Sequence, residues 1–307
     1  MRVKVLGSAA GGGFPQWNCN CRNCAGLRSG TLRAQARSHS SIAVSSDGAN
    51  WLLCNASPDI LAQIRATPEL QRRHALRGSS IVAVALTDGQ IDHAAGLLLL
   101  REGERLPVYA TELVREDLTQ GFPVLRLLDF FCGVDWHPIS IDGSSFAIPG
   151  IEGLELKALP LASKPAPFSP RREAPQPGDN IGLVMRDRHS RRSVFYAPGL
   201  AQWDDRVRRE VAGVDCLLLD GTFWTDDEMI RVGVGHKHAR EIGHLPQAGD
   251  GGMIEHLREF ANARRILIHI NNTNPILDED SNERHELDRA GIEVAYDGME
   301  LVLGART

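Results

Sequence analysis

The chain has 307 residues, a length that can bury a large core in one α/β domain or in two. Its 42% hydrophobic and 24% charged residues are typical of soluble globular proteins. The net charge of −5 gives no electrostatic case for nucleic-acid binding, and no stretch approaches the ~18 apolar residues of a membrane helix.

The hydrophobic pattern predicts short strands, with helices among them, in both halves of the chain. In the first half, strands are expected at residues 3–6, 40–45, 51–55, 81–86, 106–110 and 154–159. In the second half they are expected at residues 181–185, 194–197, 216–219, 265–270, 293–295 and 300–303. Helices are expected at residues 94–100, 111–119, 203–211, 251–261 and 278–290. Another helix should open with Ser57 as its cap and Pro58 at its first position.

Residues 163–178 contain five prolines and are expected to form a long irregular loop. The segment has few apolar side chains whose burial could offset the entropy lost on ordering it. We therefore expect the loop to be mobile without a ligand.

Three of the six cysteines, Cys19, Cys21 and Cys24, stand within six residues of one another. The chain lacks the apolar stretch of a signal peptide, so we expect a cytoplasmic protein whose cysteines are thiols or metal ligands. Three thiolates at this spacing favour a structural zinc site that is one ligand short. Free thiols are the alternative, and a redox pair is less favoured because no helix is signalled directly after Cys24. An incomplete site on a short loop also suggests a contact between the subunits of a homodimer.

The most informative segment is residues 86–97, where a buried strand runs into a turn and a polar cluster. Asp88, Gln90, Asp92 and His93 follow the strand, at the position where sheet proteins often place their chemistry. An ordinary solvated loop is the alternative interpretation. His269 closes a later predicted strand, before a polar run that breaks the regular structure.

Thr87, Asp92, His93 and Gly96 resemble the signature Thr-His-x-His-x-Asp-His-x-x-Gly of the metallo-β-lactamase superfamily. The resemblance implies an α/β fold, a four-layer αββα sandwich formed by one domain over residues 1–307. A zinc-binding cysteine loop at about residues 11–30 and the proline-rich loop at 163–178 belong to that domain. A Rossmann-like sheet is the competing fold.

The resemblance also implies a metal centre, but an altered one. His269 matches the superfamily's last metal-binding histidine, and Asp220 matches a later strand-end carboxylate that either approaches the centre or forms a turn. Asp88 and Gln90 replace the first two histidines and are further candidate ligands. The mid-chain histidine aligns near Ser163, and the bridging carboxylate aligns with residues 197–199, which contain no acidic residue.

Some superfamily members carry the same cysteine spacing with a late histidine as fourth ligand. Asn272 stands at that position here, so Asn272, His39 and a partner subunit are all candidates for the fourth ligand.

Asp92, His93 and His269 remain as the best-supported ligands and catalytic residues. Two imidazoles and one carboxylate form the facial triad of non-haem Fe(II) oxygenases, although the same groups also hold zinc. The carboxylates of Asp88 and Asp92 would repel each other without a cation or a proton.

Residues 234–246 add His236, His238 and His244 in a segment expected to be mobile and near the site. His244 is a candidate general acid or base, and a basic surface loop is the alternative.

A narrower resemblance rests on residues 11–21, 86–93, 243–246 and 269–275, which are similar to the coenzyme PQQ synthesis protein B family. This resemblance implies iron- and O₂-dependent hydroxylation of the tyrosine ring in a peptide-derived Glu-Tyr unit, during pyrroloquinoline quinone (PQQ) biosynthesis. The expected cofactors are Fe(II) at the active site and a structural Zn(II). A carrier or exporter of PQQ and a phosphodiesterase-like metallohydrolase are the alternatives.

Overall fold

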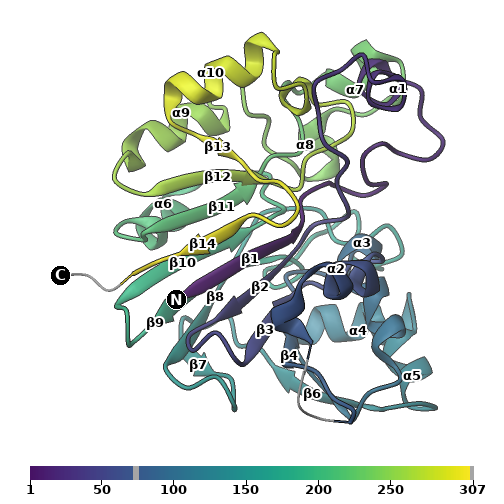
Figure 1. Cartoon of the computed structure of the whole chain (residues 1–307), viewed down its shortest axis with the longest axis vertical. Helices are drawn as coiled ribbons and strands as arrows, with labels where there is room; N and C mark the ends of the chain where they lie inside the picture. Colours follow the sequence, from purple (N-terminus) through teal and green to yellow (C-terminus); the bar gives the residue numbers. More distant parts are fainter. Residues whose placement is uncertain (72–75, 305–307) are drawn as a thin grey trace.

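The computed structural model describes residues 1–71 and 76–304. Two seven-stranded sheets pack face to face, and helices cover the outer face of each sheet (Figure 1). The predicted four-layer αββα sandwich is therefore confirmed, and the Rossmann-like alternative is wrong.

The first sheet has the order β14-β1-β2-β3-β4-β5-β6. Neighbouring strands are parallel from β3 to β6 and antiparallel elsewhere in this sheet. The strands are β1 (Arg2–Gly7), β2 (Ser41–Ser45), β3 (Trp51–Cys54), β4 (Ile81–Ala85), β5 (Leu106–Ala110), β6 (Val134–Pro138) and β14 (Glu300–Val302).

The second sheet has the order β13-β12-β11-β10-β9-β8-β7 and is parallel from β10 to β13. Its other pairs are antiparallel. The strands are β7 (Ser145–Ala147), β8 (Leu154–Pro160), β9 (Ile181–Asp187), β10 (Arg192–Ala197), β11 (Cys216–Asp220), β12 (Arg264–Ile268) and β13 (Glu293–Val294).

The helices form the two outer layers and the top of the molecule as drawn in Figure 1. The first sheet is covered by α2 (Ile60–Ala66), α3 (Ile91–Ala94), α4 (Glu112–Gln120) and α5 (Val124–Leu128). The second is covered by α6 (Asp205–Val211), α9 (Met253–Leu257) and α10 (Asn282–Ala290). The remaining helices are α1 (Arg22–Ser29), α7 (Glu228–Val232) and α8 (Ala239–Ile242). Short 3-10 helices lie at Pro68–Leu70, Ala95–Leu100, Arg258–Phe260 and Pro275–Leu277.

The interior between the sheets is apolar and is built from both of them. Ile42 and Leu52 of the first sheet and Leu183 and Leu218 of the second belong to one fully buried cluster. Burial of each such side chain contributes roughly 1.5–3 kcal/mol. This shared core fixes the two sheets against each other, and with them the strand ends that carry the polar residues.

Most predicted elements are present, with some boundary corrections. Thr111 caps α4 as expected, because its side chain accepts a hydrogen bond from the Val114 N–H. Residues 95–100 form a 3-10 helix rather than an α-helix, and α2 begins at Ile60 with Asp59, not Ser57, as its N-cap. The short elements α5, α7, α8, β6 and β7 were not predicted, since three to five residues give too little periodicity.

The proline-rich loop is irregular, as predicted, but it has buried anchors that the sequence did not suggest. Ala166 is fully buried, and Phe168 contacts Phe122. Arg171 forms ion pairs with Glu116, Asp117 and Asp179 at 2.6–2.8 Å. The expectation that little offsets the ordering entropy of this loop is therefore wrong.

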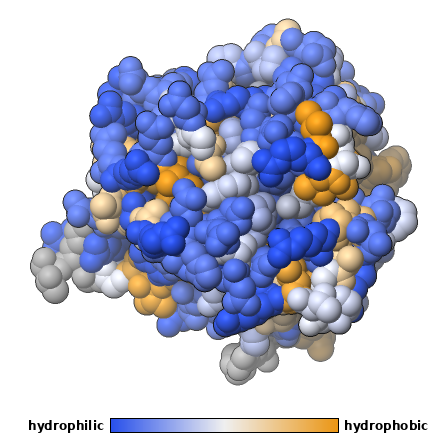
Figure 2. Space-filling model, turned by 90° about the horizontal axis from the view of Figure 1, so that it is seen from above, coloured by the Kyte–Doolittle hydropathy of each residue, from blue (hydrophilic) through white to orange (hydrophobic). Residues whose placement is uncertain are grey.

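Within the described residues, no helix combines the length and the apolar character that crossing a membrane requires. The face shown in Figure 2 is mostly hydrophilic, and its hydrophobic residues form small separate groups.

Replacing Arg171 should loosen the loop and destabilise the fold. The side chains of Asp117 and Asp179 are only 3% and 1% exposed, so Arg171→Met leaves two buried carboxylates without their cation. We expect a loss of up to about 3–5 kcal/mol in urea unfolding and faster proteolysis within residues 163–178. The control is Arg188→Met, which changes a 73% exposed arginine. Equal unfolding midpoints and cleavage rates for the two variants would contradict this account.

Candidate metal centre

The polar residues singled out in the sequence meet at one edge of the sandwich, where strands of both sheets end. Asp92 and His93 lie on α3, directly after β4, while Asp220 ends β11 and His269 follows β12. The backbone of Ala9 joins the two sheets there, since it bridges to both His39 and Ile270. Ligand sites commonly form beyond the carboxyl ends of parallel strands.

His269 was expected inside its strand, but β12 ends one residue earlier, at Ile268. His269 has a φ of 62°, in the left-handed region that a residue with a side chain rarely adopts. The Thr222 hydroxyl lies 2.9 Å from the His269 carbonyl oxygen and helps to hold this conformation. Such strain is common where a side chain must be aimed at a functional site.

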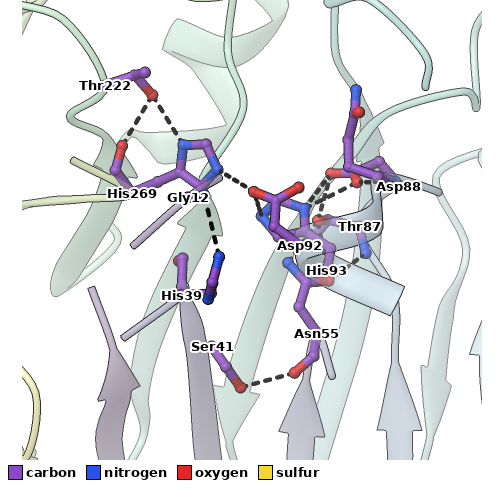
Figure 3. Close-up of polar contacts among 12 residues, drawn as sticks. Gly12, His39, Ser41, Asn55, Thr87, Asp88, Asp92, His93, Thr222 and His269 are labelled. Atoms are coloured by element: carbon purple, nitrogen blue, oxygen red, sulfur yellow. Dashed lines mark hydrogen bonds and ion pairs between the residues drawn. The ribbon is translucent and has the colours of Figure 1, made fainter. Parts of the chain in front are cut away.

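Asp92 lies between the two histidines (Figure 3). Its Oδ2 is 3.1 Å from His269 Nε2 and 3.9 Å from His93 Nε2. The centroids of the two imidazole rings are 5.1 Å apart, and the ring planes meet edge to face at 65°. The structure thus brings together all three residues predicted to bind the catalytic metal.

In each imidazole ring, the hydrogen-bond partner of Nδ1, the nitrogen farther from Asp92, determines which nitrogen carries the proton. Both Asp88 carboxylate oxygens are 2.9 Å from His93 Nδ1, so this nitrogen donates to Asp88. The Thr222 hydroxyl has one proton, for which the Asp220 carboxylate and the His269 carbonyl oxygen both compete. Thr222 Oγ1 therefore accepts from His269 Nδ1 at 2.9 Å. In each neutral ring the lone pair is then on Nε2, facing Asp92.

This arrangement places three acceptor atoms against one another with little water. His93 is 2% exposed, and its Nε2 has no hydrogen-bond partner among the described residues. Such a cluster requires a proton or a metal ion at its centre. The donor set and the orphaned Nε2 fit one divalent cation.

The ionisation of these groups reflects the same demand for positive charge. Burial alone would lower the pKa of His93, but Asp88 and Asp92 outweigh it and raise the pKa to about 9. Burial alone would raise the pKa of Asp92, yet the charges that His93 and His269 carry when protonated hold it below its usual range. Burial lowers the pKa of His269, against the opposing effect of Asp92.

Asp88 and Gln90 do not join the ligand set. Asp88 lies beyond the His93 ring and orients it, in the way that carboxylates support metal-binding histidines. Gln90 Nε2 donates to the Lys164 carbonyl oxygen at 3.2 Å. As candidate ligands, both are therefore corrected to supporting residues.

Asp220 and His244 form a second network behind His269. Asp220 Oδ2 accepts from His244 Nδ1 at 2.7 Å and from the Leu200 N–H at 2.9 Å. Asp220 fills both of its expected roles, because it accepts hydrogen bonds at the turn and also approaches the centre, where its carboxylate, His244 and His269 have ligand atoms within 4.8 Å of one another. The His244 ring stacks on His269, 5.4 Å away. Thr222, which links the two networks, was expected near the site but was given no role of its own, although the Asp-Gly-Thr turn after β11 was a usable signal.

The other histidines of residues 234–246 lie away from the centre. His236 and His238 are exposed, and His238 pairs with Asp226. His244 lines a cavity of about 220 Å³ that opens over Asp92, His93 and His269. The cavity also reaches Ser163 and Gly199, where the superfamily's missing ligands were aligned. Neither residue supplies a usual metal ligand.

The three clustered cysteines converge on Asn272. Their sulfur atoms lie 3.1–3.6 Å from Asn272 Nδ2, and rotating the amide would bring its oxygen to the same point. His39 is instead bound to Asp59 and the Gly12 N–H, which removes it from this set. Contrary to expectation, α1 does begin directly after Cys21. The argument against a redox pair therefore rests on the third cysteine and Asn272, not on the absence of a helix.

Comparison of this chain with known proteins identifies first its superfamily and then its family. The model of the beta-lactamase superfamily domain matches residues 50–270. Coenzyme PQQ synthesis protein B of Cupriavidus necator is 57% identical over 98% of this chain and 99% of its own. That of Methylococcus capsulatus is 53% identical over 99% and 100%. The chain belongs to the coenzyme PQQ synthesis protein B family, within the beta-lactamase superfamily.

Solved structures agree with this placement. The crystal structure of Zn(2+)-bound PqqB from Methylobacterium extorquens is 38% identical, with a TM-score of 0.90 over 99% of this chain and 100% of its own. A diphosphatase from the PhnP family has a TM-score of 0.68 over 99% of both chains. At 20% identity it shows the shared fold alone.

Glu228 supports the segment between the two candidate metal sites. It is 2% exposed, and its carboxylate accepts from the Trp224 N–H and the Thr273 hydroxyl. Burial raises the pKa of Glu228 to about 7, although these hydrogen bonds oppose the rise. The pKa of Glu228 is raised only in the folded state, so the folded protein holds this proton more tightly than the unfolded chain does. The stability that the proton contributes is therefore complete below pH 4.5 and is lost as the pH rises through 7.

Glu228→Gln should therefore change how stability depends on pH. The unfolding free energy of the variant minus that of the parent chain should rise by on the order of 3 kcal/mol from pH 4.5 to pH 8. Urea unfolding at pH 5, 6, 7 and 8 measures this difference. Glu102→Gln, at a 79% exposed glutamate, controls for the change in net charge. A constant difference between Glu228→Gln and the parent at all four pH values would refute the assignment.

Proposed function

We propose that this protein acts in PQQ biosynthesis as a non-haem iron, O₂-dependent hydroxylase of the tyrosine ring in a peptide-derived Glu-Tyr dipeptide. The family's name supports the pathway. The observation that carries the reaction class is the acceptor cluster of Asp92, His93 and His269, which opens on a cavity. Two imidazoles and a carboxylate on one side of an ion leave positions for O₂ and a substrate.

Each hydroxylation replaces a ring C–H bond by C–OH. One atom of O₂ enters the ring and the other leaves as water, with two electrons from an external reductant and two protons. A ferrous ion held by the three residues supplies the redox chemistry that O₂ needs to react. The protein's contribution is to hold that ion, orient the ring and exclude water.

The cavity offers residues for these tasks. Phe223, Met229 and Ile242 provide an apolar lining against which an aromatic ring packs. His244 keeps Nδ1 on Asp220, which leaves Nε2 as the nitrogen that exchanges a proton with the phenol. Asp220 raises the pKa of His244 against the opposing effect of burial, so His244 is ready to carry that proton.

A two-metal hydrolase has less support. Ser163 and Gly199 line the cavity where that chemistry would require a histidine and a bridging carboxylate, so the usual ligand set of a two-metal hydrolase is incomplete. A carrier has no need for a buried, preorganised cation site. We therefore place both below the hydroxylase.

We also propose a structural zinc on Cys19, Cys21 and Cys24, with the Asn272 side chain closing the site. Trp17, within the cysteine loop and two residues before Cys19, is 86% exposed, which suits a zinc-braced contact between two subunits of a homodimer.

The direct test of the reaction uses anaerobically purified, Fe(II)-loaded protein, Glu-Tyr, a reductant and O₂. Mass spectrometry should find a product heavier by oxygen in the tyrosine ring. His93→Ala and His269→Ala should each lose more than 100-fold in rate, while Asp88→Asn, which only reorients His93, should lose roughly 10–100-fold. Gln90→Ala is the matched control in the same loop and should lose least. Full iron occupancy and full turnover in His269→Ala would overturn the ligand assignment, whereas no hydroxylated product from the iron-loaded parent protein would favour the carrier.

The zinc site has a separate test. Replacing the three cysteines by serine in a His269→Ala background should remove the remaining tightly bound zinc, measured by elemental analysis. Cys132→Ser in the same background keeps it. Sizing should show a shift towards monomer on zinc loss. One zinc per chain in the triple variant would contradict the proposed ligands, and an unchanged size would contradict the dimer contact.

A further inference from the structure

The cavity over the metal centre has a polar part that the chemistry above does not use. Lys164, Arg172 and Asn180 line it, and all three come from the proline-rich loop or the residues that lead from it into β9. The ring-binding residues Phe223, Met229 and Ile242 come from a different part of the chain. One cavity therefore offers both an apolar surface and a set of hydrogen-bond donors.

Asn180 is the most informative of the three. It is 4% exposed, and its Nδ2 has no partner among the residues that the structure describes. Rotating the amide would put the oxygen in that place and still leave a buried polar atom unpaired. A buried amide without a partner costs stability, and native structures retain such groups mainly where a ligand or water satisfies them. Because Asn180 lines the cavity, its missing partner is expected to be a ligand.

The two cations that line the same cavity have weak or no acidic partners. Lys164 Nζ lies 3.6 Å from Glu173, a carboxylate that is 88% exposed and contributes little in water. Arg172 donates to the Pro165 carbonyl oxygen, and no acidic partner is found for it in residues 1–71 and 76–304. The position of Lys164 is also fixed, since its carbonyl oxygen accepts from Gln90. Two positive charges and one unpaired amide favour an anionic ligand group.

We propose that Lys164, Arg172 and Asn180 form a carboxylate subsite that selects an acidic dipeptide and places its aromatic ring over Asp92, His93 and His269. The proposal rests on the hydroxylase function, and it names the residues that distinguish Glu-Tyr from a free or neutral tyrosine compound. Charge-assisted hydrogen bonds to carboxylates are about twice as strong as neutral ones, which gives the subsite its selectivity.

The test measures binding rather than turnover. Zinc-loaded protein is titrated calorimetrically with Glu-Phe, which lacks the phenol, and with Gln-Phe amide, an analogue of similar shape in which both carboxylates are replaced by amides. The parent protein should bind Glu-Phe at least tenfold more tightly. Lys164→Met and the nearly isosteric Asn180→Asp should each weaken Glu-Phe binding on the order of tenfold, with Gln-Phe amide and the metal content unchanged. Lys237→Met removes a lysine charge at an exposed position and should have no effect.

The outcomes separate this inference from the function on which it rests. Equal affinity of the parent for Glu-Phe and Gln-Phe amide would overturn the subsite, as would unchanged Glu-Phe affinity in both cavity variants. If Glu-Phe binds with the predicted selectivity but Fe(II)-loaded protein does not hydroxylate Glu-Tyr, the subsite stands and the hydroxylase assignment fails.

Discussion

Three buried acceptor atoms that face one another are the constraint on which the rest of this site depends. Asp92 Oδ2 lies within 4 Å of both imidazole Nε2 atoms, and His93 Nε2 has no partner among the described residues. Without positive charge between them, these atoms would repel one another at a largely buried site where little water can screen them. Asp88 and Thr222 keep the three acceptor atoms facing one another. They bind the Nδ1 atoms of His93 and His269, so the Nε2 lone pairs point towards Asp92.

The fold makes this convergence possible. Each sheet has a parallel half, and the ends of β4 in one and of β11 and β12 in the other reach the same edge of the sandwich. The bridges from Ala9 to His39 and Ile270 close the seam between the sheets at that edge. Residues more than 170 positions apart in the chain, such as Asp92 and His269, thereby contact each other directly.

Much of this organisation could be predicted from the sequence, for identifiable reasons. Buried strands such as β4 and β11 are continuous apolar runs, and the residues that follow them must lie at strand ends. That reasoning, with the superfamily signature, was enough to single out Asp92, His93 and His269. It did not distinguish metal ligands from the residues that orient them, because the sequence alone does not show which of the two carboxylates, Asp88 or Asp92, faces the metal. Only the structure shows that Asp88 lies behind the ring of His93.

Other features depend on long-range contacts that local patterns do not encode. The proline-rich loop is held by Arg171, whose partners Glu116 and Asp117 are more than 50 residues away. The sequence gave no indication of a role for Asn180. Its role is inferred from the missing hydrogen-bond partner of its buried Nδ2 among the described residues, which only the structure reveals. In the same way, α1 was missed because its eight residues have weak amphipathic character and no side-chain cap.

The central claim is that Asp92, His93 and His269 bind one iron ion through Asp92 Oδ2 and the two Nε2 atoms. Anomalous diffraction at the iron edge, from crystals grown anaerobically with Fe(II), tests it most directly. The account predicts a single strong peak next to these three atoms, with Asp88 and Asp220 remaining on the far nitrogens of His93 and His244. A peak on Asp220 and His244, or a pair of peaks bridged across the cavity, would contradict it.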